Sequence, residues 1–245
     1  MNKNYKILKV RDKTDSYYTP VERLFDLPFK LLINGKSQIS GKTTIILNLL
    51  LNPAFGYDKL FDGDNIYICS NNKLDNKLDL MADKLEIPED NRFIFDEDYL
   101  EILYEDLEEQ FKDAVNEGEK PPNILIIFDD CGYSGSLKSY KKQNIVDKMV
   151  CNGRHLCLSQ IYTSQRFSQV STTLRTNLTG AIMFSTSMKE LDLIIEDFNY
   201  METKKQFIKI FRETTKEPRT FMVFNFSNKP AEMYLDSNFE PIKWK

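Results

Sequence analysis

The fold of this chain is indicated most clearly by the segment Gly35-Lys36-Ser37-Gln38-Ile39-Ser40-Gly41-Lys42-Thr43-Thr44. It stands between a short apolar run at residues 31–33 and a longer apolar segment at 43–51. A buried strand, a loop containing glycines and a following helix form the setting in which backbone N–H groups and a helix N-terminus bind phosphate. In such a loop Lys42 would reach the β- and γ-phosphates, and the Thr43 hydroxyl would bind Mg²⁺. The stretch therefore predicts a site for ATP with Mg²⁺.

One feature of the loop departs from the usual pattern. Five residues separate the two glycines instead of four, and Lys36 stands where the first glycine is expected. The alternative interpretation is an ordinary basic helix start, since a Gly-Lys-Thr triplet also occurs by chance. The strand before it and the helix after it favour the phosphate loop. The nucleotide-binding residues that it predicts are Gly35, Lys36, Ser37, Gln38, Ile39, Ser40, Gly41, Lys42, Thr43 and Thr44.

A second motif places two carboxylates at the end of the most apolar run in the chain, residues 124–128. Asp129 and Asp130 follow that run directly, and ligands of parallel α/β sheets bind at the carboxyl ends of the strands. We expect Asp129 to hold Mg²⁺ and Asp130 to polarise the attacking water. The alternative is that the two acids only cap a turn before Gly132. Two adjacent acids favour hydrolysis over phosphate transfer to a small acceptor.

The rest of the chain alternates between strand and helix patterns, which predicts an α/β fold with a mostly parallel sheet. Residues 1–28 are polar and mixed, so we expect an arm there and a single domain over 29–245. Further strands are expected at 65–70, 93–95, 156–163, 181–184, 220–226 and 232–235. Helices are expected at 73–86, 97–116, 141–150, 172–177, 187–198 and 202–212. Asn72-Lys73-Leu74-Asp75 spells a guanine-reading motif, but it precedes the acidic strand, so we interpret it as a helix start.

Other bulk features exclude whole classes of protein. No apolar run is long enough to span a bilayer, and the first nine residues contain no signal-peptide core. The four cysteines share no metal-type spacing and the chain has one histidine, so a zinc site or a disulfide framework is not expected. We expect a protein that is not secreted and has no membrane segment of its own.

A third block follows the predicted strand at 156–163. Gly153, Arg154 and His155 precede that strand, Gln165 follows it, and residues 170–177 read VSTTLRTN. With the two earlier motifs, this order resembles the viral genome-packaging ATPases of the FtsK–HerA superfamily, in particular the poxvirus-type enzymes of large DNA viruses and virophages. The resemblance covers about residues 30–185. Ser171 and Leu174 depart from the family pattern, which has proline and isoleucine there.

The resemblance implies a RecA-like P-loop NTPase fold with a C-terminal β-hairpin, assembled as a ring that binds ATP between neighbours. Lys42, Thr43 and Asp129 match the family's phosphate and Mg²⁺ residues. Asp130 matches the water-activating acid, a position that is often glutamate in the wider superfamily, and Gln165 matches a polar sensor at a strand end. For an arginine finger acting on the neighbouring subunit's site, it implies Arg154 and then Arg175. The alternatives are a surface arginine for Arg154, and a neighbour contact or a salt bridge at the core for Arg175.

The net charge of −4 conceals an uneven distribution. Residues 83–119 contain 15 acidic and 3 basic residues, so this stretch carries −12 and the rest of the chain +8. A basic stretch at 138–154 predicts contact with DNA phosphates, with an ordinary solvated helix face as the alternative. The lysines expected to bind DNA are Lys138, Lys141, Lys142 and Lys148. A second, weaker basic face is predicted at residues 204–212, and the acidic stretch is expected to lie away from the DNA.

Taken together with these motifs, the resemblance implies an ATP-driven motor that moves double-stranded viral DNA into a preformed capsid. The expected partners are further copies in a pentameric or hexameric ring, double-stranded DNA and a capsid vertex protein. We expect it in the host-cell cytoplasm at sites of virus assembly, or with the virion. The rival hypotheses are a P-loop nucleoside or nucleotide kinase and a non-catalytic ATP-binding scaffold.

Overall fold

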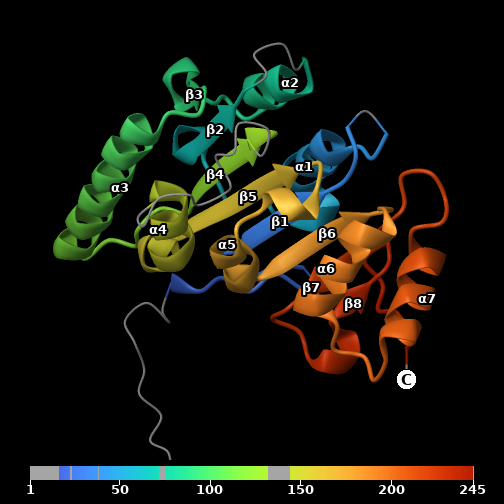
Figure 1. Ribbon diagram of the computed structural model, residues 1–245. Coiled ribbons are helices and arrows are strands. Elements are labelled where there is room, and N and C mark those ends of the chain that lie inside the picture. Colours follow the sequence, from blue (N-terminus) through green and yellow to red (C-terminus); the bar gives the residue numbers. More distant parts are fainter. Residues whose placement is uncertain (1–16, 23, 38, 72–75, 132–143, 245) are drawn as a thin grey trace, which may run out of the picture.

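The computed structural model describes residues 17–22, 24–37, 39–71, 76–131 and 144–244. One mixed α/β sheet with helices on both faces organises these residues (Figure 1). The strands are β1 Lys30–Asn34, β2 Ile66–Ser70, β3 Arg92–Phe93, β4 Ile124–Asp129, β5 Leu158–Ser164, β6 Gly180–Phe184, β7 Phe221–Asn225 and β8 Tyr234–Leu235. The helices are α1 Lys42–Leu51, α2 Asn76–Lys84, α3 Glu97–Glu117, α4 Ile145–Asn152, α5 Thr172–Asn177, α6 Met188–Phe198 and α7 Lys204–Thr214.

The sheet has eight strands in the order β3-β2-β4-β5-β1-β6-β7-β8. The strands from β3 to β6 run parallel, whereas β7 pairs antiparallel with both β6 and β8. This confirms the predicted α/β class and the antiparallel strands near the C-terminus. Since the parallel strands share one direction, their carboxyl ends lie together along one edge of the sheet. We call this the carboxyl edge, and the opposite one the amino edge.

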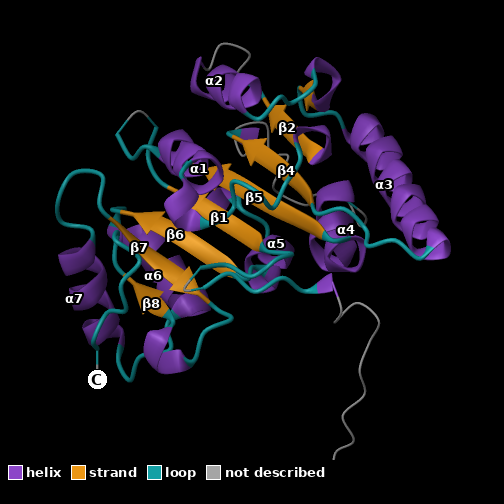
Figure 2. Cartoon of the chain, turned by 180° about the vertical axis from the view of Figure 1, so that it is seen from behind, coloured by secondary structure: helices purple, strands orange, loops and turns teal. Residues whose placement is uncertain are grey.

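Alternation along the strands gives the sheet two buried faces. Leu32 packs into one core with α3 to α7, whereas Leu31 and Ile33 pack into a second core with α1 and α2. Figure 2 shows α1 and α2 on the side turned away in Figure 1. Both faces are covered, so every residue of the central strands β1, β2, β4, β5 and β6 is buried, as in other parallel sheets.

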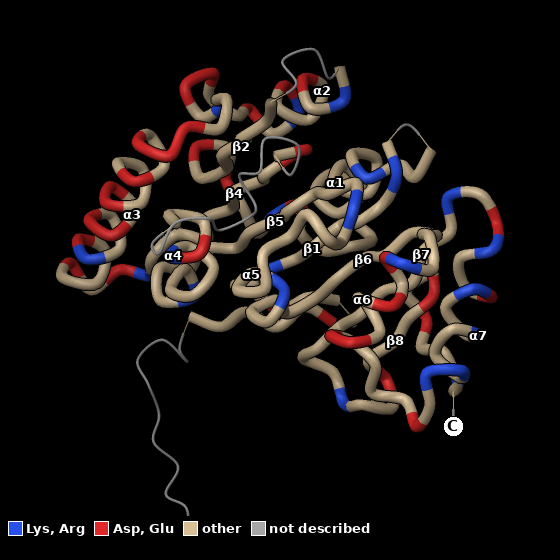
Figure 3. The backbone as a smooth tube through the Cα atoms, viewed as in Figure 1, with Lys and Arg blue, Asp and Glu red and all other residues tan. Residues whose placement is uncertain are grey.

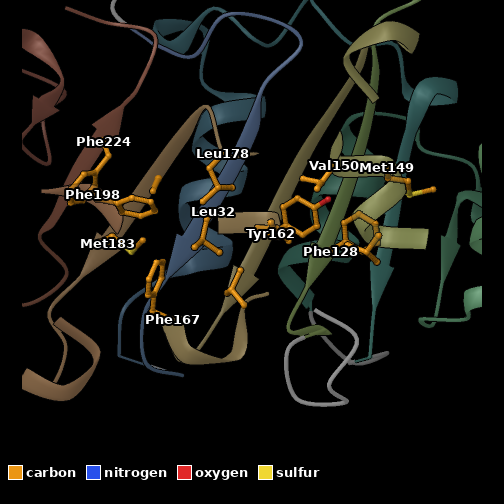
Figure 4. Close-up of a cluster of buried hydrophobic side chains, with 14 of the residues drawn as sticks. Leu32, Phe128, Met149, Val150, Tyr162, Phe167, Leu178, Met183, Phe198 and Phe224 are labelled. Carbon is orange, nitrogen blue, oxygen red and sulfur yellow. The ribbon is translucent and has the colours of Figure 1, made fainter. Parts of the chain in front are cut away.

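The first core holds β4 and β5 together beneath α4 (Figure 4). The rings of Phe128 on β4 and Tyr162 on β5 stack with centroids 4.9 Å apart. Tyr162 donates its hydroxyl to the Gln160 side chain, whose amide donates to the Met149 carbonyl in α4 at 2.9 Å. Burial raises the pKa of Tyr162 well above its ordinary value, so the hydroxyl stays a donor. This packing fixes the two strands whose ends carry Asp129 and Gln165.

Three structural details differ from the sequence expectations. Leu24, Phe25 and Leu27, inside the predicted arm of residues 1–28, are buried in the second core. Strand β5 starts two residues later than expected, because Gly153–Leu156 form a 3₁₀ turn. The spacing of Ser187 and Glu190 predicts a capping box at the start of α6, but the Glu190 carboxylate accepts hydrogen bonds from the backbone and hydroxyl of Ser168 instead.

Candidate active site

The phosphate loop joins β1 to α1, as predicted, and its two glycines are structurally required. Gly41 has a φ of +89°, a value that residues with a Cβ atom rarely adopt. A Cβ at Gly35 would lie 2.7 Å from the Cβ of Ser40 and 2.8 Å from the Phe184 ring. The Ser40 hydroxyl in turn donates to the Lys36 carbonyl at 2.7 Å. The extra residue lengthens the loop between the two glycines, where the Lys36 side chain is exposed.

Lys42 is the first residue of α1 and is held in the mouth of the loop. Its side chain is almost fully buried, and its Nζ donates to the Gly35 carbonyl at 3.1 Å. The same Nζ lies 3.7 Å from Oδ1 of Asp130. Gly41 supplies no side-chain cap to α1, so the first N–H groups of this helix are available to an anion. A cation and a helix N-terminus thus face the same point.

The two predicted carboxylates lie on this edge, and Thr163 of the neighbouring strand β5 positions both. Asp129 is 3% exposed, and its Oδ1 accepts from the Thr163 hydroxyl at 2.8 Å. The backbone N–H of Asp130 donates to the same hydroxyl oxygen at 2.8 Å. Asp130 has a φ of +49°, a conformation that costs energy for an L-residue and turns its side chain toward Lys42.

Asp130 offers an acceptor that the described part of the chain does not use. Its Oδ1 is buried and has no hydrogen bond there, while the Lys42 ammonium lies 3.7 Å from it. A buried carboxylate oxygen without a donor is costly unless a ligand or water completes it. Together with Thr43 and Asp129, this is a set of hard oxygen donors of the kind that Mg²⁺ takes.

The donor set fits a Mg²⁺ ion that arrives with a nucleotide rather than one held by protein alone. In the described residues no group of three His, Cys, Asp or Glu side chains is gathered that could hold a metal ion. Mg²⁺ commonly takes one or two protein ligands and completes its shell with phosphate and water. Thr43 and Asp129 would be those ligands.

The structure places Gln165 beside the loop. Gln165 directly follows β5 and is exposed, while the carbonyl of the preceding Ser164 accepts from the Gly35 N–H at 3.0 Å. The loop, the two acids and Gln165 therefore meet at the carboxyl edge. Thr44, the last residue of the predicted loop, accepts a hydrogen bond from the Lys77 ammonium at 2.9 Å. Gln38 and residues 72–75 lie outside the described residues.

Arg154 does not join this group within one chain. It lies in the turn before β5, at the amino edge, where it is exposed and its Nε contacts Nε2 of His155 at 3.4 Å. The seven residues of β5 separate the two edges by roughly 20 Å, several times the length of an arginine side chain.

Arg175 adopts the salt-bridge alternative stated above. Its guanidinium pairs with the Asp197 carboxylate at 2.7 Å and lies over the Phe167 ring, 4.9 Å from the centroid. Burial raises the pKa of Asp197, and the arginine partly opposes that shift. The side chain is only 16% exposed, so this guanidinium is engaged inside its own chain. The prediction of Arg175 as a second candidate finger is therefore not supported by this geometry.

Of the four lysines predicted to bind DNA, the structure describes only Lys148. Its ammonium lies 4.2 Å from the centroid of the Tyr104 ring on α3, and the residue lines a cavity of about 680 Å³ together with Glu101 and Glu105. Lys148 thus sits beside acidic groups rather than on an open basic surface. Residues 138, 141 and 142 lie outside the described part of the chain.

Thr163 is a site residue that was not among those predicted from the sequence. Its signal was available as one polar residue near the end of an apolar strand, but its partners follow only from the pairing of β4 with β5.

All four cysteines are free thiols. Within the described residues, no helix has the length and apolar character required to cross a bilayer.

Comparison with solved structures supports the P-loop NTPase fold. The genome packaging NTPase B204 from Sulfolobus turreted icosahedral virus 2 in complex with AMP matches with a TM-score of 0.57 and 16% identity, over 81% of this chain and 93% of that chain. The DNA-packaging ATPase B204 from Sulfolobus turreted icosahedral virus matches with a TM-score of 0.55 and 16% identity, over 86% and 97%. ATPases 2 and 3 of EssC from Geobacillus thermodenitrificans match with a TM-score of 0.57 and 18% identity, over 81% of this chain and 38% of that one.

A comparison with curated proteins finds no match. The family model described as Poxvirus A32 protein matches residues 19–238, which include the phosphate loop, both aspartates and Gln165. Since this match spans most of the chain, the chain belongs to the Poxvirus A32 protein family.

Proposed function

We propose that this protein is an ATP-hydrolysing motor that moves double-stranded viral DNA into a preformed capsid. The observation that carries the hydrolytic part is the buried Oδ1 of Asp130, which has no hydrogen bond among the described residues and lies 3.7 Å from Nζ of Lys42. Family membership and the likeness to packaging NTPases support the DNA part.

The free site holds Lys42 between the Gly35 carbonyl and Asp130. A triphosphate in the loop would draw the ammonium onto its β- and γ-oxygens and receive the first N–H groups of α1. Asp130 would then lose its cation and become the acceptor for a proton from water. Mg²⁺, held by Thr43 and Asp129, would neutralise charge on the phosphate oxygens.

In the chemical step, a water oxygen forms a bond to the γ-phosphorus while the bond to the β-γ bridging oxygen breaks, which yields ADP and phosphate. Asp130 accepts the proton that the water gives up, and Gln165 can hydrogen-bond the same water or the γ-phosphate. Arg154 of a neighbouring copy would supply the remaining positive charge. This assignment requires a ring in which the amino edge of one copy faces the carboxyl edge of the next.

Acidic residues gather along α3 at one end of the sheet, whereas both acidic and basic residues lie around α7 at the other end (Figure 3). Helix α3, beside β3 and β4, is strongly acidic, whereas α7 at the other end carries exposed basic residues. Those residues are Lys204, Lys205, Lys209 and Arg212. We place the DNA path away from α3. We further propose that the copies form a pentameric or hexameric ring and that this ring docks on a capsid vertex protein. We propose that the protein acts in the host-cell cytoplasm or in the virion.

The test is the ATPase rate of the wild-type chain and of Asp130→Asn, with and without long duplex DNA, together with particle mass in a non-hydrolysable ATP analogue. We expect a ring, a rate that DNA increases, and a variant that binds ATP but turns over about 10²–10⁴-fold more slowly. Asp113→Asn, an exposed aspartate on α3, is the matched control and should match the wild type. Native-rate hydrolysis by Asp130→Asn would contradict the mechanism. Transfer of phosphate to a nucleoside would show that the protein is a kinase. Binding of ATP without turnover by the wild type would show that it is a non-catalytic scaffold.

A further inference from the structure

A second cavity adjoins the phosphate loop on the side away from the two aspartates. It has a volume of about 310 Å³ and lies between the loop and the segment 215–220, which joins α7 to β7. Strand β7 runs antiparallel to β6, so Phe221 at the start of β7 pairs with Phe184 at the end of β6. This pairing brings segment 215–220 to the carboxyl edge beside the loop.

The strand order sets the direction in which a bound nucleotide would extend. Strand β4, which carries Asp129 and Asp130, lies on one side of β1, with β5 between them, whereas β6 and β7 lie on the other side. A triphosphate whose γ-phosphate faces the aspartates would therefore direct its nucleoside toward β6 and β7. The second cavity lies there, so this inference rests on the proposed function.

The cavity offers the chemistry that a nucleoside and its first phosphate need. Ile39 is 67% exposed, and together with Phe184 it provides apolar surface for a base. Lys36, Lys216 and Arg219 line the same cavity together with the acidic Glu217, so its charged lining is net positive. A planar guanidinium can stack on the face of a base and also pair with a phosphate.

The backbone at Arg219 gives a second, independent observation. Residues 217–220 form a turn in which the Thr220 N–H donates to the Glu217 carbonyl at 3.2 Å, with Pro218 at its second position. Arg219 occupies the third position with a φ of +66°, where turns of this kind favour glycine. A large charged side chain in a strained conformation beside a ligand cavity is characteristic of a functional site.

We propose that this cavity binds the nucleoside of ATP and that Arg219 is the residue that holds it. Arg219 belongs to the wall of the cavity that segment 215–220 forms, while Lys36, Ile39 and Ser40 of the loop form another part of that wall. The nucleotide would then bridge Lys42 in α1 and Arg219 before β7, two segments that the sequence separates by more than 170 residues.

Glycine at position 219 tests the side chain without damaging the turn. Arg219→Gly removes the guanidinium, and the positive φ becomes favourable, so the melting temperature should stay the same or rise. Glu86→Gly is the matched control, because Glu86 is an exposed residue with a φ of +53° next to α2 and does not line this cavity. Calorimetry with Mg²⁺ would measure the affinity of ATP, ADP and inorganic tripolyphosphate for each variant.

We expect Arg219→Gly to weaken ATP and ADP by about tenfold and tripolyphosphate by less than twofold. Glu86→Gly should bind all three as the wild type does. The inference is overturned if Arg219→Gly binds ATP as tightly as the wild type, or if tripolyphosphate weakens as much as ATP. Lys42→Ala separates the two proposals, because unchanged binding of tripolyphosphate by that variant would refute the phosphate site itself.

Discussion

The two edges of the parallel sheet differ in how many of the candidate catalytic residues they carry. At the carboxyl edge, Lys42, Asp129, Asp130 and Gln165 come together from β1, β4 and β5, although they are spread over more than 120 residues of sequence. The amino edge holds Arg154 and the buried Lys30, whose pKa is lowered mainly by burial, with the Arg154 guanidinium adding to the shift. The phosphate loop after β1 and the aspartates at the end of β4 lie at the opposite edge from both of these residues.

This contrast shows what one chain can and cannot assemble. Parallel strands bring chain-distant residues together only at the edge where they all end. An arginine at the other edge cannot reach the same phosphate, so a catalytic role for Arg154 requires a second copy. A ring supplies that copy by repeating one contact around an axis.

Arg154→Ala gives the largest expected change, and it tests directly whether the amino edge takes part in catalysis. If Arg154 serves the neighbouring site, turnover should fall by about 10³-fold or more, with the ATP KM changed by only a few fold. Steady-state ATPase assays without DNA measure both constants. Arg212→Ala, an exposed arginine on α7, is the control and should remain within twofold of the wild type. Equal rates in the two variants would leave the amino edge without a part in catalysis.

Thr163→Val tests how the carboxyl edge is built. The change removes the hydroxyl that contacts both Asp129 and the Asp130 backbone while keeping the shape of the side chain. We expect turnover to fall by about 10²-fold, because displaced carboxylates no longer face the phosphate correctly. The Mg²⁺ concentration needed for half-maximal rate should also rise, a change that a loss of stability alone does not cause. Thr163→Ser keeps the hydroxyl and should restore most of the rate.

Arg175→Ala should affect stability rather than catalysis. It leaves the partly buried Asp197 without its ion pair, which should lower the free energy of unfolding by roughly 1–3 kcal/mol. Urea denaturation measures that loss, and turnover per folded molecule should stay within twofold. A large fall in turnover at unchanged stability would restore Arg175 as a candidate finger.

The smallest effect is expected on α3. Glu105→Gln with Glu109→Gln removes two charges from the acidic helix, and we expect DNA affinity to change by less than twofold if the DNA path lies elsewhere. Filter binding over a range of salt concentrations would measure it. A marked increase in affinity that disappears at high salt would place α3 beside the DNA.

The parts of the site that follow from local pattern could be predicted from the sequence. The loop at residues 35–44 and the acids after β4 each follow an apolar strand, and a strand end is a local property of the chain. Thr163 could not be assigned a role, because its partners depend on β5 pairing with β4. The ion pair of Arg175 with Asp197 likewise depends on how α5 packs against α6.

The fold was predictable to the same degree. The alternation of strands and helices can be read from the spacing of apolar residues along the sequence. The antiparallel direction of β7 relative to β6 cannot be read in this way. That reversal brings segment 215–220 to the phosphate loop, so Arg219 was invisible until the strands were placed. Residues 24–27 were also misjudged, because a short apolar run is obscured by the polar residues before it.

Mixing two inactive variants tests the shared site most directly. Asp130→Asn keeps Arg154 but lacks the water-activating acid, and Arg154→Ala keeps the acid but lacks the arginine. If the arginine acts on the neighbouring copy, equal amounts mixed under conditions of subunit exchange should recover about a quarter of the wild-type rate, since that share of interfaces pairs an intact acid with an intact arginine. A mixture no more active than its two components would contradict a site completed across two copies.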